Sequence, residues 1–292
     1  MLTARALQVC TTLFPFERWS PQLSSLARRY RENQPCPHIL LKEFLDPDLA
    51  RSLAREFPSP GGSLWTQYKH VNENKLGLPK RDLFPPMLGA LTDELNSPEF
   101  VRWVSALTGI PNLIADPTLE GGGLHQSGPG GYLNVHTDFS QHHVYTKWRR
   151  RVNLILYLNA GWETTWGGSI ELWEKSRKGK MRRCAAKYPP LLNHALIFTT
   201  DERSLHGFPD PLTCPEGQSR KSLALYYYTE EGSGQFSAHS TDYFARPQDG
   251  WKASAMIWLD KKAVDLYSRA KARFGFSDEL ASKVLGFLSK KK

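Results

Sequence analysis

Apolar residues recur at helical spacing through most of the first 110 positions of the chain. Leucines, alanines and aromatic residues return every three or four positions in four segments, with charged residues on the opposite side. This period is that of an amphipathic helix. The pattern predicts helices at residues 18–33, 47–57, 87–95 and 98–108.

Two of these helices have clear start signals. Asp46 and Ser97 each precede a proline. A short polar side chain at the N-cap accepts hydrogen bonds from the first free N–H groups, and proline in the first turn loses no hydrogen bond. Gly109 follows the second of these helices, where a left-handed residue commonly ends a helix. The apolar faces of these helices must pack against another layer, and we expect this layer to be a sheet that the helices cover.

Two shorter segments separate the helices. Residues 38–44 are predicted to form a strand. Residues 58–80 are rich in loop-forming residues, with one or two short strands. This segment would form either a wall over a substrate or a surface connection, and the surface connection is favoured.

Between residues 118 and 229 the pattern changes to short apolar or alternating runs, broken by glycine, asparagine and proline. The clearest runs are 132–135, 153–158, 169–173, 195–199 and 222–228. Such spacing is typical of a β sandwich or barrel. Farther on, Asp260 and Ser277 resemble caps before apolar stripes, which predicts two C-terminal helices.

The predicted chain is therefore α+β, with three regions. Residues 1–117 form a helical support region, residues 118–235 a β domain and residues 236–292 a C-terminal helical extension. Bracing of the barrel is favoured for this extension over self-association into a homodimer.

Composition narrows the class of protein. The 292 residues are 40% hydrophobic, enough for a substantial core, and no apolar run approaches the roughly 20 residues of a membrane span. The N-terminus lacks the pattern of a signal peptide. The cysteines have no zinc-site or disulfide-framework spacing; they are Cys10, Cys36, Cys184 and Cys214. We expect a cytoplasmic protein with reduced thiols and no membrane partner.

The net charge of +9 lies mostly in three basic clusters, at residues 147–151, 175–183 and 290–292. Solvated loops and a solvated tail are the favoured interpretation. No nucleic-acid motif with interleaved aromatic residues accompanies the clusters, so a nucleic-acid partner is a minor option.

A candidate metal site lies at the end of an extended run. His136 and Asp138 are two residues apart, and strands send such residues to the same side. His206 follows the apolar run 195–199, precedes Gly207 and is the third candidate ligand. Two imidazoles and one carboxylate with open positions suit non-haem Fe(II) and oxygen chemistry. The alternative is that His136 and Asp138 only pair with each other.

Five motifs around these residues carry a family resemblance. They are Gly-Gly-Tyr-Leu-Asn-Val-His-Thr-Asp at 130–138, Leu-Tyr-Leu-Asn at 156–159, Trp-Gly-Gly-Ser-Ile-Glu-Leu at 166–172, His206, and Ser-Arg-Lys-Ser-Leu-Ala-Leu-Tyr-Tyr-Tyr at 219–228. In this order they resemble the 2-oxoglutarate and Fe(II)-dependent dioxygenases, in particular the prolyl 4-hydroxylase-like branch. The resemblance covers residues 118–229 and implies a double-stranded β-helix, or jelly roll, whose open mouth holds the metal.

The resemblance also implies cofactors and an anchor for the co-substrate. These are Fe(II) held by the triad, 2-oxoglutarate, O₂, and ascorbate as the reductant that such enzymes often use. Arg220 is the candidate partner of the distal carboxylate of 2-oxoglutarate, because a guanidinium binds a carboxylate through two parallel hydrogen bonds. By alternation Arg220, Ser222, Ala224 and Tyr226 share a face and Lys221 points the other way, but Lys221 remains the fallback.

Two tyrosines are secondary candidates. Tyr157 matches a family position whose hydroxyl binds the same carboxylate, and Tyr132 would line the mouth of the pocket. Core packing is the alternative for both. Gln126 stands where prolyl hydroxylases often carry a tyrosine that reaches the co-substrate, which argues against proline as the substrate.

The implied reaction is hydroxylation of an unactivated C–H bond in a peptidyl or small-molecule substrate, with release of succinate and CO₂. Loops at residues 65–80, 141–151 and 203–218 would determine specificity, and the arginines at 149–151 would suit an acidic or phosphorylated substrate. The alternatives are a non-catalytic jelly roll that binds a partner through its basic loops, and a nucleic-acid demethylase of the same wider superfamily.

Overall fold

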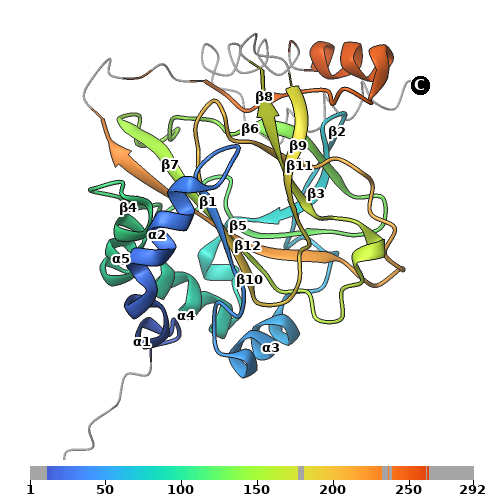
Figure 1. Ribbon diagram of the computed structural model, residues 1–292. Helices are drawn as coiled ribbons and strands as arrows, with labels where there is room; N and C mark the ends of the chain where they lie inside the picture. The colour runs from blue at the N-terminus through green and yellow to red at the C-terminus, as the bar shows by residue number, and fades with distance from the viewer. Residues whose placement is uncertain (1–11, 177–180, 232–235, 237–238, 261, 263–292) are drawn as a thin grey trace, which may run out of the picture.

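The computed structural model describes residues 12–176, 181–231, 236, 239–260 and 262 (Figure 1). In this part the chain is α+β, with N-terminal helices beside a large antiparallel sheet and a further helix at residues 250–260. The labelled helices are α1 (Phe16–Trp19), α2 (Leu23–Glu32), α3 (Pro47–Glu56), α4 (Pro86–Leu95) and α5 (Pro98–Thr108), with short 3-10 turns η1 (Ser20–Gln22), η2 (Arg81–Leu83) and η3 (Thr164–Trp166).

The predicted N-terminal helices are confirmed, together with their caps. Asp46 accepts hydrogen bonds from the backbone N–H groups of Asp48 and Leu49, at 2.8 and 3.2 Å. Ser97 accepts one from Phe100 at 3.2 Å, and Gly109 ends α5 with φ of +74°. The helix predicted at 18–33 begins earlier and is interrupted by η1, which contains a proline.

The strands form one sheet in the order β1-β10-β7-β12-β5-β3-β6-β11-β8-β9, with β2, β4 and β13 at its margins. Their bounds are β1 (His38–Leu41), β2 (Thr66–His70), β3 (Glu73–Leu78), β4 (Ile114–Ala115), β5 (Gly123–Ser127), β6 (Tyr132–Thr137), β7 (Trp148–Tyr157), β8 (Ile170–Lys175), β9 (Met181–Tyr188), β10 (His194–Thr199), β11 (Leu205–Phe208), β12 (Arg220–Glu230) and β13 (Asp242–Tyr243). All pairings are antiparallel. The expected jelly roll is confirmed.

Strand β3 joins the two halves of the sheet. Leu76 is in register with Gln126 of β5, and Glu73 is in register with Leu133 of β6. This link makes the barrel nearly closed. Because β1 and β3 belong to the same sheet, the N-terminal region contributes strands to the barrel as well as helices that support it.

Alternation along β12 separates the core from the interior of the barrel. Leu223, Leu225 and Tyr227 are buried in the main apolar cluster with residues of the N-terminal helices, and the Tyr227 hydroxyl donates a hydrogen bond to the carbonyl of Leu95 in α4 at 2.9 Å. Successive strand residues point to opposite faces. The helices therefore cover one face of this strand and leave the other for a cavity.

The structure corrects several predicted elements. Strand β1 ends at Leu41, because Glu43 turns the chain with φ of +53°. Strands β7 and β9 include the basic residues 149–151 and 182–183, which were predicted to be loops. Asp260 lies inside the helix that begins at residue 250, and not at the start of a helix. The stripes after residue 262, including Ser277, lie outside the described residues, as does Cys10.

Candidate metal centre and its cavity

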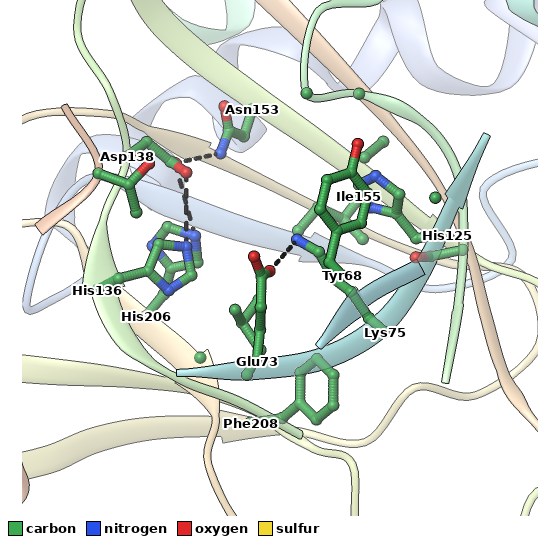
Figure 2. A pocket seen from close by; sticks show the side chains of 18 of the residues that line it. Tyr68, Glu73, Lys75, His125, His136, Asp138, Asn153, Ile155, His206 and Phe208 are labelled. Atoms are coloured by element: carbon green, nitrogen blue, oxygen red, sulfur yellow. Dashed lines mark hydrogen bonds and ion pairs between the residues drawn. The ribbon is translucent and has the colours of Figure 1, made fainter. Parts of the chain in front are cut away.

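The three predicted metal ligands meet at the interior face of the barrel (Figure 2). His136 of β6 and His206 of β11 are register partners on neighbouring strands, and Asp138 follows the end of β6. The Asp138 oxygens lie 3.6 Å from His136 Nε2 and 3.5 Å from His206 Nε2. One ligand atom from each residue lies within 4.8 Å of the other two, a spacing that allows all three to bind one ion.

Backbone carbonyls hold the two imidazoles in position. His136 Nδ1 donates to the carbonyl of Asn134 at 2.9 Å, and His206 Nδ1 donates to that of Ser204 at 2.8 Å. With Nδ1 protonated, the Nε2 lone pairs face the site, as is common for histidine ligands. Burial lowers the pKa of His206 to about 4, which keeps it in the neutral form that binds metals. This set of two histidines and one carboxylate fits Fe(II).

The second oxygen of Asp138 is held by two residues that the sequence did not single out. Asp138 Oδ2 accepts a hydrogen bond from Asn153 Nδ2 at 2.8 Å and lies 3.2 Å from Arg150 Nη2. Burial would raise the pKa of the Asp138 carboxyl, but the Arg150 guanidinium holds it well below its usual range. Asp138 is thus a carboxylate whose Oδ1 remains for a metal.

Arg150 corrects the interpretation of the basic cluster as a solvated loop. Its side chain is almost fully buried, with the guanidinium 3.4 Å from the ring centroid of Tyr226 and 4.7 Å from that of Phe139. Arg150 Nε donates to Asn153 Oδ1 at 2.8 Å. These contacts make Arg150 part of the structure around Asp138.

A cavity of about 260 Å³ extends from the three ligand residues along β12. Arg220, Ser222, Ala224 and Tyr226 all line it, which confirms the alternation predicted for this strand. Lys221 is not among the described residues that line the cavity. Of the two candidate anchors, Arg220 is therefore the one whose side chain lines the cavity beside the triad.

Two neighbouring oxygens hold the Arg220 guanidinium in place at the cavity. Its Nε donates to the carbonyl of Gly168 at 2.7 Å, and its Nη2 donates to the Tyr157 hydroxyl at 3.3 Å. The side chain is 6% exposed and lies over the ring of Phe208, 4.1 Å from its centroid. Tyr157 is fully buried, so its hydroxyl orients Arg220.

The expected position of Tyr132 is wrong. Its hydroxyl donates to the carbonyl of His70 at 3.0 Å, and it is not among the described residues that line the cavity. The side-chain amide of Gln126 is engaged by the carbonyl of Pro58 and the hydroxyl of Ser219. Its neighbour His125 lines the cavity, a residue that sequence reasoning missed.

The hairpin of β2 and β3 forms a wall of the cavity, so the favoured interpretation as a surface connection is wrong. Glu73, Lys75 and Gly77 alternate along β3 and all line the cavity. Glu73 binds Lys75 Nζ at 2.9 Å and His70 Nε2 at 2.9 Å. His70 Nδ1 lies 3.4 Å from an oxygen of Asp260, which connects the hairpin to the C-terminal helix.

This connection predicts a pH-dependent stability. Burial would lower the pKa of His70, but hydrogen bonds to Asp260 and Glu73 raise it from 6.5 to about 9. The stabilisation should be complete below pH 6.5 and disappear as the pH rises through about 9, a loss of about 2–3 kcal/mol. Urea unfolding at pH 6 and pH 9.5 measures it.

A His70→Gln variant is the control, because glutamine fits the site without titrating. The difference in unfolding free energy between the two pH values should shrink in this variant. An equal pH dependence in both proteins would contradict the assigned role of His70.

Sequence and structure comparisons agree with this geometry. The profile of the 2OG-Fe(II) oxygenase superfamily matches residues 122–228, the segment that contains the triad and Arg220. A prolyl hydroxylase from Trichoplax adhaerens, solved with a hypoxia inducible factor oxygen degradation domain peptide fragment, is 15% identical, with 74% of this chain and 92% of that chain covered and a TM-score of 0.51. A prolyl-4-hydroxylase from Pseudomonas putida is 18% identical, with 72% and 100% covered and a TM-score of 0.48. No curated protein sequence matches.

A nearly closed jelly roll brings two histidines and an aspartate together inside its mouth, an arrangement that suits non-haem iron and oxygen chemistry. Residues 122–228 match the 2OG-Fe(II) oxygenase superfamily, and this family implies Fe(II) and 2-oxoglutarate. No helix in the described part of the chain is long and apolar enough to cross a membrane.

Proposed function

We propose that this protein is a 2-oxoglutarate-dependent hydroxylase that acts on a C–H bond of a peptidyl or small-molecule substrate and releases succinate and CO₂. The observation that supports it most strongly is the convergence of His136, Asp138 and His206 at a cavity that also contains a buried arginine. A non-catalytic binding protein would need neither the converging metal-ligand residues nor the buried cation.

Each of these residues has a distinct role in the proposal. His136, Asp138 and His206 hold Fe(II), which when bound supplies the oxidising chemistry together with O₂. Arg220 binds the distal carboxylate of 2-oxoglutarate through the N–H groups that are not used by Gly168 and Tyr157. Two parallel N–H donors at the edge of a guanidinium match the two oxygens of a carboxylate. Arg150 and Asn153 keep Asp138 ionised and oriented. The barrel walls exclude water from the reacting groups.

The proposed activity predicts that turnover depends on iron. The purified chain should convert 2-oxoglutarate to succinate with Fe(II) and ascorbate, and should do so slowly without a primary substrate. Chelation with EDTA should remove the activity, and excess Fe(II) should restore it while Zn(II) should not, because Zn(II) occupies such sites without redox chemistry. Succinate is quantified by chromatography. Succinate formation that is unaffected by EDTA would contradict the proposal.

A further inference from the structure

The cavity contains a second group of polar residues, on strands β3 and β5 beside the strand that carries Arg220. Lys75 of β3 points into the cavity beside Glu73, and His125 of β5 lies near it (Figure 2). The Lys75 side chain is 19% exposed, so its ammonium lies mostly out of bulk water. Gly77 leaves room at this point, because a Cβ there would lie 2.9 Å from the Tyr68 ring and 3.4 Å from the His125 ring.

His125 has a hydrogen-bond donor that no described residue uses. Within the described residues neither of its ring nitrogens has a hydrogen-bond partner. Burial, followed by the charge of Lys75, lowers the pKa of His125 to about 3, so the imidazole is neutral and carries one N–H. Lys75 has three N–H donors, of which Glu73 accepts one. Unpaired donors that face a cavity from neighbouring strands can bind an acceptor of a ligand.

The charges of the cavity favour an anionic acceptor. Lys75, Arg150 and Arg220 are the cations among the described lining residues, whereas Glu73 and Asp138 are the anions. The charges of Fe(II) and of the 2-oxoglutarate dianion cancel. The charges of the protonated His70 and of Asp260, which lie behind the wall, cancel in the same way. The loaded cavity therefore retains one excess positive charge in a setting of low dielectric, where charges interact strongly.

Lys75 is the cation left to meet this anion. Arg150 is engaged with Asp138, and Arg220 is assigned to the co-substrate. Glu73 is shared between Lys75 and His70, so its charge is only partly available to Lys75. We propose that Lys75 and His125 form a subsite for a carboxylate of the primary substrate, which is therefore an acid that places its carboxylate against β3 and β5. This inference rests on the proposed function, because it assumes that metal and co-substrate occupy the triad and Arg220.

The test uses the full chain loaded with Mn(II) and saturating 2-oxoglutarate, with butyrate and butyramide as probes of similar shape and different charge. Mn(II) in the triad shortens the proton relaxation times of a molecule bound beside it, so NMR titration reports both affinity and location. Butyrate should bind about tenfold more tightly than butyramide or better, as expected for charge-assisted hydrogen bonds.

Variants assign this preference to the subsite. Lys75→Met should remove the preference for butyrate, and Lys69→Met, which changes an exposed lysine on the same hairpin, should retain it. Because Lys75→Met removes one of the two cations that contact Glu73 and could unfold the wall, the double variant Glu73→Gln, Lys75→Met is measured beside it and should also lack the preference.

Equal binding or no binding of the two probes to the native chain overturns the inference. A butyrate preference that survives in both Lys75 variants also overturns it. Mn(II) and 2-oxoglutarate binding is measured first in the same samples. Failure at this first step would refute the proposed function, whereas loading followed by no carboxylate preference would refute only the subsite.

Discussion

Replacement of His136 by alanine should abolish Fe(II)-dependent succinate formation and weaken Mn(II) binding about a hundredfold or more. Removal of residues that merely support metal ligands costs up to about a hundredfold in affinity, and His136 is itself one of three groups that face the ion. Without it, His206 and Asp138 cannot define the coordination geometry. Electron paramagnetic resonance of free Mn(II) measures the affinity, and chromatography measures succinate.

The matched control for this experiment is His143→Ala. The His143 side chain is 71% exposed and contacts Glu120 outside the triad, so its loss should leave metal affinity and turnover close to native values. Circular dichroism of both variants verifies the fold. If His136→Ala retained native Mn(II) affinity, the metal centre would have to lie elsewhere.

Local signals were sufficient to predict the N-terminal helices and two of the three triad residues. The caps at Asp46 and Ser97 act within three residues, and their hydrogen bonds are made as expected. The pairing of His136 with Asp138 depends on alternation along one strand. His206 required the additional assumption that a distant strand lies beside β6, and the order of the family motifs supplied that assumption.

The structure around Asp138 could not be predicted in this way. Arg150 lies in a run of basic residues that is indistinguishable from a solvated loop in sequence. It is buried because β7 pairs with β12 through a bulge at Tyr227/Tyr228 and because Asp138 offers an anion inside the barrel. A contact that forms only in the folded structure, and not any local sequence pattern, determines the position of this charge.

The identity of the cavity-facing residue on β5 depended on strand register. A shift of one residue moves every side chain of a strand to the other face, and the sequence does not fix the register of β5 on its own. Ser222 of β12 is in register with His125, and residues in register share a face, so His125 faces the cavity with Ser222. The role of the β2–β3 hairpin was missed for a similar reason, since its place between β5 and β6 is set by long-range pairing.

Arg220→Met should abolish 2-oxoglutarate binding without destabilising the protein in the absence of this ligand. Among the described residues no carboxylate lies within ion-pair distance of the Arg220 guanidinium, whose partners are the neutral oxygens of Gly168 and Tyr157. Burial lowers its pKa, which indicates a cation that is costly to bury without an anion. Methionine of similar length removes this cost together with the anchor.

Thermal unfolding in Mn(II), with and without 2-oxoglutarate, separates the two effects. The native chain should gain stability with the ligand, by about 2.7 kcal/mol at a hundredfold excess over its dissociation constant. Arg220→Met should show no gain and a ligand-free melting temperature equal to or above that of the native chain. Lys221→Met is the control from the opposite face of β12 and should retain the gain.

Arg220→Lys extends this argument, because it keeps the charge but loses the planar fork that matches a carboxylate. Its ligand-induced gain should fall between those of the native chain and Arg220→Met. If Arg220→Met kept the full gain while Lys221→Met lost it, the anchor would be Lys221. A large loss of ligand-free stability in Arg220→Met would instead show that Arg220 stabilises the fold through Gly168 and Tyr157, and that the buried charge is not held in reserve for an incoming anion.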